Sequence, residues 1–384
     1  MMKKVAIAAV HWKHNHGSML QALALQQALT ELGVVNEIID MTGLHSEIRK
    51  NRMPFYLRQV FSPSFLATKI GKIKYELLYK KRVNGLDIRK KRFTEFEDRL
   101  TLSTQYKSMA KLAKACEEYS HVMVGSDQLW LPINIAGNYY TLNFVPYNIP
   151  KISYATSFGV AQITKTYHEK YRHFLKRITH LSVREESGKQ LIKSLIGKDA
   201  QEVCDPTMLF DQHGWTSLIP NKQNKLTDYI FCYFLGGNKH HREFANALKQ
   251  RTGLPIVAMV HMEEYHYCDN NFADHAITDA GPEEFVNLIR GASYVCTDSY
   301  HGTVFSLIHS KEFWTLKRHS DNSAMSTNTR IESLLASLGL NDRYSAAEKT
   351  VTNNIIDYSF VHACLQQKRN KALDFLKNSL DVQE

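Results

Sequence analysis

Residues 293–308 read S-Y-V-C-T-D-S-Y-H-G-T-V-F-S-L-I, and this stretch combines the signals of a strand, a turn and a helix. Its apolar opening, residues 294–296, is typical of a strand. Residues 297–299 offer three side chains that can cap a helix, and apolar residues then recur at helical spacing as far as Ile308. A strand that turns directly into a helix leaves unpaired N–H donors and a partial positive charge, where an anion can bind. The sequence therefore predicts an anion-binding turn that carries His301.

The first half of the chain repeats this strand–loop–helix pattern. Residues 5–10 predict a buried strand, residues 11–18 a polar loop and residues 19–32 a helix. Further strands are predicted at residues 34–40, 121–124, 151–155 and 181–183. Such alternation is typical of a doubly wound α/β domain, which binds ligands beyond the carboxyl ends of its strands. The first loop has no glycine-rich phosphate signature, so a dinucleotide or a nucleoside triphosphate is not indicated.

Neither a metal site nor a disulfide framework is predicted. The first loop carries His11, His14 and His16, but no acidic or cysteine ligand stands at a matching spacing. The six cysteines are scattered, and three of them fall in strand-like runs: Cys204, Cys232 and Cys296. We therefore expect buried free thiols in a reducing compartment.

Four successive predicted strands of the first half end in small, polar or charged clusters, which suggests a lined crevice. Arg184 directly follows one of these strands, and its forked donors suit a carboxylate or a phosphate. A structural salt bridge from Arg184 to Glu185 or Glu186 is the alternative interpretation.

A polar, turn-rich segment at residues 221–228 predicts a linker, and a second α/β unit follows it. Strands are expected at residues 229–235, 256–260, 294–296 and 312–316, and a mostly helical tail at residues 353–380. We predict an N-terminal domain over residues 1–220, with a basic helical insertion at about 41–105, and a C-terminal domain over residues 221–384. The C-terminal helix is expected to fold back on the first domain, and a cleft is expected between the domains.

Composition indicates a folded protein of 384 residues with 43% apolar side chains. We find no signal peptide, because the apolar run after Lys4 is short and no small-residue cleavage site follows it. No stretch approaches the length of a membrane span. We therefore expect a cytoplasmic protein, with contact at the inner face of the membrane as an additional hypothesis.

The net charge of +10 is concentrated in one segment. Residues 49–99 contain 15 Lys and Arg against 5 Asp and Glu, which accounts for the whole surplus. Such a block suits an anionic membrane, an acidic substrate or another polyanion, and the alternative is a solvated helical insertion without a partner. No nucleic-acid motif is present and residues 69–82 read as an amphipathic helix, so we favour an interfacial or acceptor-binding role over nucleic acid.

Seven motifs follow one another along the chain, and in this order they resemble the polysaccharide pyruvyl transferase family over about residues 3–345. Each of them lies near a predicted strand end or helix start. They are N-H-G with L-Q-A at residues 15–22, G-S-D-Q-L-W at 125–130, S-Y-A-T-S-F-G at 153–159, S-V-R-E-E-S at 182–187, D-P-T at 205–207, D-S-Y-H-G-T at 298–303, and T-R-I with L-L at 329–335.

The resemblance implies two Rossmann-like halves around a cleft, similar to the GT-B glycosyltransferase architecture. It implies transfer of the enolpyruvyl unit of phosphoenolpyruvate onto two hydroxyls of a sugar in a cell-surface or capsular polysaccharide precursor. The products are a pyruvate ketal and phosphate, and no metal or organic cofactor is expected. A glycan or a lipid-linked oligosaccharide is the expected acceptor.

The resemblance implies that Arg184 binds an anionic group of the donor, and that His301 contacts the phosphate or acts as an acid or base. The residues expected to bind substrate are Asn15, Gly17, Ser126, Asp127, Gln128, Ser157, Gly236, Ser299, Tyr300, Lys317, Arg318 and Arg330.

One departure separates this chain from some members of the family, which carry arginine and leucine just before the histidine. Here Ser299 and Tyr300 precede His301, so Lys317, Arg318 or Arg330 must supply the second positive charge. Two rival functions stay open. A glycosyltransferase that uses a nucleotide sugar would need an acidic residue for the ribose, with Glu332 as a weak candidate. A non-catalytic glycan- or membrane-binding protein would use the basic block.

Overall fold

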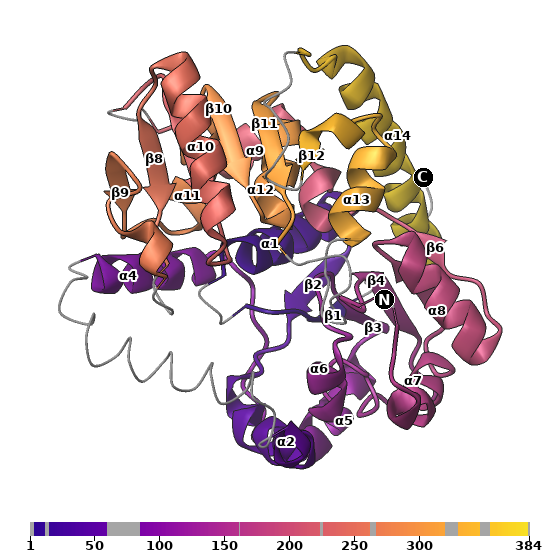
Figure 1. Cartoon of the computed structure of the whole chain (residues 1–384). Helices are drawn as coiled ribbons and strands as arrows, with labels where there is room; N and C mark the ends of the chain where they lie inside the picture. Colours follow the sequence, from indigo (N-terminus) through magenta and orange to yellow (C-terminus); the bar gives the residue numbers. More distant parts are fainter. Residues whose placement is uncertain are drawn as a thin grey trace.

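The computed structural model describes residues 4–11, 15–59, 85–160, 162–222, 226–261, 266–318, 329–345 and 354–382. Two six-stranded sheets, each parallel throughout its described pairs, organise this part of the chain, with helices packed on both (Figure 1). The α/β class with two doubly wound sheets is thereby confirmed. The amphipathic helix predicted at residues 69–82 lies outside the described residues.

The first sheet has the order β2-β1-β3-β4-β5-β6. Its strands are β1 (Lys4–Ala8), β2 (Val35–Ile38), β3 (His121–Val124), β4 (Lys151–Thr156), β5 (His180–Val183) and β6 (Gln201–Glu202). The order reverses next to β1, which is the kind of switch point where α/β sheets bind ligands. Seven of the fourteen predicted site residues follow strands of this sheet, from Asn15 after β1 to Arg184 after β5.

The second sheet has the order β12-β11-β10-β7-β8-β9. Its strands are β7 (Ile230–Tyr233), β8 (Ile256–Met259), β9 (His275–Ile277), β10 (Tyr294–Thr297), β11 (Glu312–Leu316) and β12 (Tyr344–Ser345). The predictions missed β9 and β12, because both are short and lack a buried apolar run.

The helices close to the site begin where the sequence provides caps. Asn15 accepts a hydrogen bond from the Ser18 N–H, so α1 starts three residues earlier than predicted. Ser299 caps α12 through the Gly302 N–H. The described helices are α1 (His16–Glu31), α2 (His45–Gln59), α4 (Leu86–Glu97), α5 (Met109–Ala115), α6 (Pro132–Ala136), α7 (His168–Leu175), α8 (Glu186–Ile196), α9 (Gln212–Leu218), α10 (Lys239–Thr252), α11 (Pro282–Gly291), α12 (Tyr300–Ile308), α13 (Thr329–Ala336) and α14 (Tyr358–Ser379).

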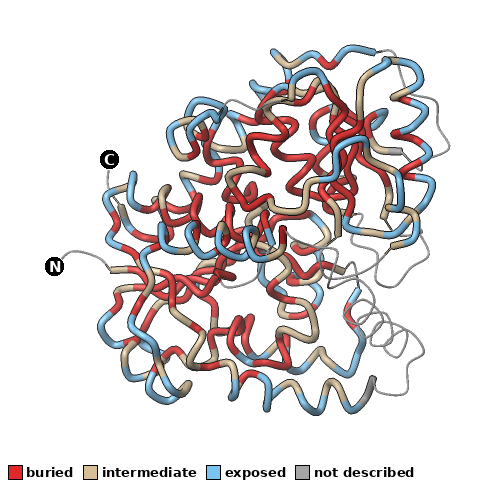
Figure 2. Tube along the Cα trace, turned by 90° about the vertical axis from the view of Figure 1, so that its left-hand side faces the viewer, coloured by how far each residue is buried: buried red, intermediate tan, exposed pale blue. Residues whose placement is uncertain are grey.

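Helix α1 lies between the two sheets and joins them (Figure 1). It is buried on nearly all sides, which suits a helix at the centre of a protein. One continuous apolar core includes Leu20 of α1, Met123 of the first sheet and Phe305 of the second half. Figure 2 shows buried segments running through the junction of the halves, so they pack together closely rather than facing across an open gap.

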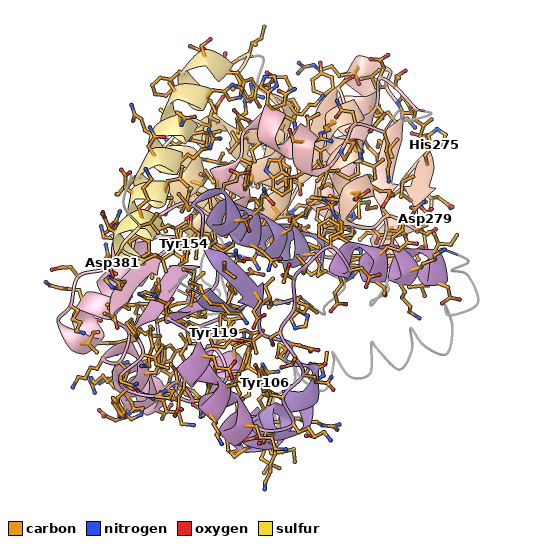
Figure 3. The ribbon with its side chains drawn as sticks, turned by 180° about the vertical axis from the view of Figure 1, so that it is seen from behind. Tyr106, Tyr119, Tyr154, His275, Asp279 and Asp381 are labelled. Atoms are coloured by element: carbon orange, nitrogen blue, oxygen red, sulfur yellow. The ribbon has the colours of Figure 1, made fainter. Side chains whose placement is uncertain are left out.

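Part of the basic block is used inside the protein. Helix α4 packs Phe93 and Phe96 into the shared core. Arg92 donates to the carbonyl of Asp279, which Figure 3 labels beside α4, at 2.9 Å. Arg99 pairs with Glu283 at 2.8 Å. These two arginines therefore bind the insertion to the second half.

Helix α14 crosses back onto the first half. The Arg369 Nε donates to the Met208 carbonyl at 3.1 Å, and the Phe375 ring lies 6.4 Å from that of Tyr154 on β4 (Figure 3). The 3-10 helix η5 (Pro206–Leu209) carries Met208, so α14 contacts the segment that follows β6. No described helix is long and apolar enough to cross a membrane.

Replacing His309 with glutamine should make the stability of the protein less sensitive to acid. Burial, and next the Arg290 guanidinium, lower the pKa of His309 to about 3, whereas a histidine in the unfolded chain titrates near 6.5. A depressed histidine pKa gives stability that is complete above pH 6.5 and is lost as the pH falls toward 3.

Urea unfolding at pH 7.5 and pH 5.0 should therefore show the wild type losing about 2 kcal/mol more than the variant. The exposed His173 serves as the control position, because its change to glutamine should leave the pH dependence unaltered. Equal losses in the wild type and the His309→Gln variant would contradict this prediction.

Candidate functional site

The candidate site is centred on Asp205, a fully buried carboxylate just beyond β6. It receives hydrogen bonds at 2.6 Å from Arg184 Nη1 and at 3.0 Å from the Ser126 hydroxyl. Its second oxygen accepts from the Thr207 N–H and hydroxyl. The His301 Nε2 lies 3.7 Å away, so Asp205 brings residues from both halves to one point.

His301 sits in the first turn of α12 and packs against the first turn of α1. A Cβ added to Gly17 would lie only 2.0 Å from the His301 Nδ1, so no side chain fits at position 17 while the ring holds its place. Asn15 and Ser299 are the caps of these two helices. The positive ends of both helix dipoles therefore meet at His301, and an anion is favoured there.

Asp127 lies on the other side of Arg184. Its φ of 78° is in the left-handed region, which aspartate tolerates better than most residues. The carboxylate accepts from the Ser18 hydroxyl at 2.7 Å and from the Gln128 N–H at 2.8 Å, and the Arg184 Nη2 lies 3.8 Å away. Strained backbone of this kind is often found at functional sites.

Tyr300 stands between two arginines. The guanidinium carbon of Arg184 lies 4.4 Å from the centre of the Tyr300 ring, and that of Arg330 lies 5.6 Å from it. Arg330 comes from α13, not from the turn before His301. Of the three cations considered for the second positive charge, Arg330 is the one that the structure places beside Arg184.

Charges in the site hold two carboxyls ionised. Burial would raise the pKa of Asp205, but His301 and Arg184 lower that pKa well below its ordinary value. Burial is likewise the largest influence on Asp127, yet Arg184 and then His301 lower its pKa overall. Burial and repulsion by Arg184 lower the pKa of Arg330 to about 10, which still leaves it charged at neutral pH.

Glu185 behaves differently from the other two carboxyls. Burial raises its pKa more strongly than Arg184 and Arg330 lower it. The Ser157 hydroxyl donates to Glu185 Oε1 at 2.7 Å, while Oε2 has no hydrogen-bond partner among the described residues. A buried carboxyl with a raised pKa is suited to holding a proton for transfer.

Several donors in the site are left without hydrogen-bond partners among the described residues. They are buried, and they comprise Arg184 Nε and Nη2, Arg330 Nε and His301 Nε2. Unpaired buried donors are costly, so their presence indicates room for an acceptor such as an oxyanion.

The remaining predicted residues fall into two groups. Ser126 and Ser157 support Asp205 and Glu185, and Gln128 lies against Gly159. Arg318 donates to the Asp298 carbonyl at 2.7 Å, and Gly236 donates its N–H to the Asp298 carboxylate at 3.0 Å. This second group surrounds Asp298 in the second half.

Two alternatives from the sequence concern residues whose contacts the structure shows. Arg184 forms its shorter ion pair with Asp205 at 2.6 Å, and the expected ion pair with Glu185 is also present, at 3.9 Å. The sequence did not reveal Asp205 as a partner, because Asp205 reaches Arg184 only through the pairing of β6 with β5. Glu332, the candidate for binding the ribose of a nucleotide sugar, pairs with Lys317 at 3.5 Å.

The two described histidines of the first loop, His11 and His16, form contacts to other segments of the chain. His11 lies 3.0 Å from Glu97 and accepts from the Met41 N–H, while His16 donates to the Ala280 carbonyl at 3.0 Å. His14 lies outside the described residues. Within the described chain, no group of three metal-ligating side chains gathers.

Asp205, Glu185 and Ser18 were missed as site residues. Asp205 precedes a proline and reads as an ordinary helix cap, and it does cap η5. Its second role depends on strand order, which the sequence does not reveal. The D-P-T motif was the only available signal.

Several solved structures share the fold of this chain over nearly its whole length. The UDP-GlcNAc 2-epimerase of Methanocaldococcus jannaschii shares 10% identity with this chain, covering 95% of it and 92% of the epimerase, with a TM-score of 0.48. The E. coli ADP-heptose LPS heptosyltransferase II shares 14% identity over 96% and 99% of the two chains, with a TM-score of 0.40. MurG of Acinetobacter baumannii shares 10% identity with this chain, covering 99% of it and 95% of MurG, with a TM-score of 0.44. No curated protein matches the chain.

The family model described as polysaccharide pyruvyl transferase matches residues 15–320. This match spans Arg184, Asp205 and His301, and it ends before Arg330 and α14. Because it covers well over half of the sequence, the chain belongs to the polysaccharide pyruvyl transferase family.

Proposed function

We propose that this protein transfers the enolpyruvyl group of phosphoenolpyruvate to two hydroxyls of a sugar and forms a pyruvate ketal. The observation that carries the proposal is the meeting of Arg184, Arg330 and His301 between the first turns of α1 and α12. Phosphoenolpyruvate carries a carboxylate and a phosphate, and two arginines with unpaired donors suit two anionic groups.

The reaction needs two bond-forming steps at the same carbon. One sugar hydroxyl adds to the enol carbon and gives its proton to a base, while the methylene carbon takes a proton from an acid and becomes a methyl group. The second hydroxyl then forms its bond to that carbon as the bond to the phosphate oxygen breaks, and its proton leaves with the departing phosphate or a nearby base. Atoms balance, since one donor and one diol yield one ketal and one phosphate.

Each site residue has a task in this scheme. Arg184, oriented by Asp205, holds a donor anion, and Arg330 supplies the second positive charge. His301 contacts the phosphate or moves a proton between phosphate and sugar oxygen. Glu185, which lies 3.9 Å from Arg184 Nε and whose pKa is raised by burial, is the group proposed to deliver the proton to the methylene carbon. The acceptor is a glycan or a lipid-linked oligosaccharide of a polysaccharide precursor, and the basic block is proposed to approach an anionic membrane surface.

Changing Glu185 to glutamine should lower kcat about 100-fold or more, as expected when a general acid is removed. A carboxyl whose folded pKa is raised destabilises the folded state once the pH passes its unfolded value of 4.5. The variant should therefore be at least as stable as the wild type at pH 7, which thermal melting would check. Unchanged kcat would remove Glu185 from the mechanism.

Incubation with phosphoenolpyruvate and candidate acceptor glycans tests the proposed function. The protein should release phosphate only when an acceptor is present, and mass spectrometry should show the pyruvate ketal. The His301→Ala variant should abolish both signals. A protein that neither binds phosphoenolpyruvate nor releases phosphate with any acceptor would not have this function.

A further inference from the structure

A small, partly open cavity lies beside the site and shares Arg184 and Tyr300 with it. Its volume is about 70 Å³. Asp127, Asp205 and His301 do not line it, whereas Arg184 and Arg330 do. The polar and aromatic residues of its wall that matter here are Arg184, Arg330, Tyr300, Glu202, Lys368 and Lys371.

The wall is strongly cationic. Four positive side chains face a single carboxylate, that of Glu202, whose pKa burial raises. Arg184 is already paired with Asp205 through Nη1, but its Nε and Nη2 have no hydrogen-bond partner among the described residues. The same holds for Arg330 Nε, and both arginines are more than nine-tenths buried. Buried cations that have unpaired hydrogen-bond donors at a cavity wall are stabilised by an anionic acceptor in the cavity.

Lys368 and Lys371 reach the cavity because α14 is fixed in place. Arg369, between them, donates to the Met208 carbonyl, and Gln201 of β6 donates to the Lys371 carbonyl at 3.4 Å. Lys368 is half-buried and Lys371 is exposed, so the lysines form the outer side of the cavity. Helix α14 lies beyond the residues that the family model matches.

We propose that this cavity is a phosphate subsite, in which the C-terminal helix supplies two lysines to a phosphate group held by Arg184 and Arg330. Resting on the proposed function, the phosphate is the one that phosphoenolpyruvate carries and loses. The inner arginines bind it as forked donors, and the outer lysines guide it in and out as flexible point charges. His301 does not line the cavity, so in this arrangement it moves a proton at the ketal-forming centre and does not contact the phosphate.

Calorimetric titration with inorganic phosphate tests the subsite directly. The double variant Lys368→Met/Lys371→Met should bind phosphate at least about tenfold more weakly than the wild type, since hydrogen bonds to charged groups contribute at this level. Lys377→Met is the matched control, because Lys377 lies on α14 but does not line the cavity. Product inhibition by phosphate in the ketal assay should weaken by the same factor.

The outcomes separate this subsite from the proposed function. Phosphate affinity that is equal in the wild type and the double variant, or absent from both, overturns the subsite even when ketal formation is normal. Phosphate binding that the double variant loses and the control keeps supports the subsite. If that result appears together with no turnover of phosphoenolpyruvate, the proposed function fails and the subsite stands.

Discussion

Replacing Gly17 with alanine is expected to lower kcat at least about 100-fold, because a catalytic group displaced by 1 Å can cost that much. The added methyl group would lie 2.0 Å from the His301 Nδ1, so the buried ring has to move. The backbone conformation at position 17 permits alanine, because Gly17 is helical and alanine is the better helix former.

The loss should therefore appear in activity more than in folding. Gly188→Ala is a suitable control, because Gly188 is also buried in the first turn of a helix and the nearest neighbour of its added methyl group would be Val183, at 3.2 Å. The double change Gly17→Ala/His301→Ala should be no less active than His301→Ala alone. A fully active Gly17→Ala protein would show that the position of the His301 ring is irrelevant to the reaction.

Replacing Asp205 with asparagine is expected to destabilise the protein by about 3–5 kcal/mol and to abolish activity, because breaking a buried ion pair leaves an uncompensated charge. Arg184 would lose its closest partner, and His301 would lose the carboxylate 3.7 Å from its Nε2. Urea unfolding at pH 7 measures the stability difference.

The pH dependence provides a second check on Asp205. Its folded pKa is lowered, with burial opposing and His301 and Arg184 driving the shift, so the carboxylate stabilises the protein above the unfolded pKa of 3.8. That contribution is lost as the pH falls below this value, and the difference between wild type and variant should narrow there. Asp211→Asn is the control, since Asp211 caps α9 and asparagine caps equally well. Equal effects of the two changes would contradict a central role for Asp205.

The sequence was sufficient for most of the fold. Buried apolar runs such as residues 121–124 and 256–260 predict their strands almost to the residue, because central parallel strands are apolar on both faces. Strands β9 and β12 escaped prediction, since each is short and lies at the edge of its sheet. The placement of α1 between the sheets could not be predicted from the sequence either, because local periodicity does not show which faces of a helix are covered by other elements.

The sequence predicts a site residue where a single segment contains both that residue and the strand that positions it. His301 and Arg184 each follow a strand, and both strands deliver them to the same carboxylate. Asp205 and the pairing of Arg330 with Tyr300 depend on contacts between distant segments, which only strand order and domain packing determine. The departure of Tyr300 from the family pattern is explained by these contacts, since its ring supports two arginines.

The most direct test of the account is calorimetric titration of phosphoenolpyruvate into the wild type and into the Arg330→Met variant, with UDP-GlcNAc as the comparison ligand. We predict saturable binding of phosphoenolpyruvate by the wild type, affinity at least about tenfold weaker in the variant, and no binding of the nucleotide sugar. Binding of the nucleotide sugar without any binding of phosphoenolpyruvate would contradict the account.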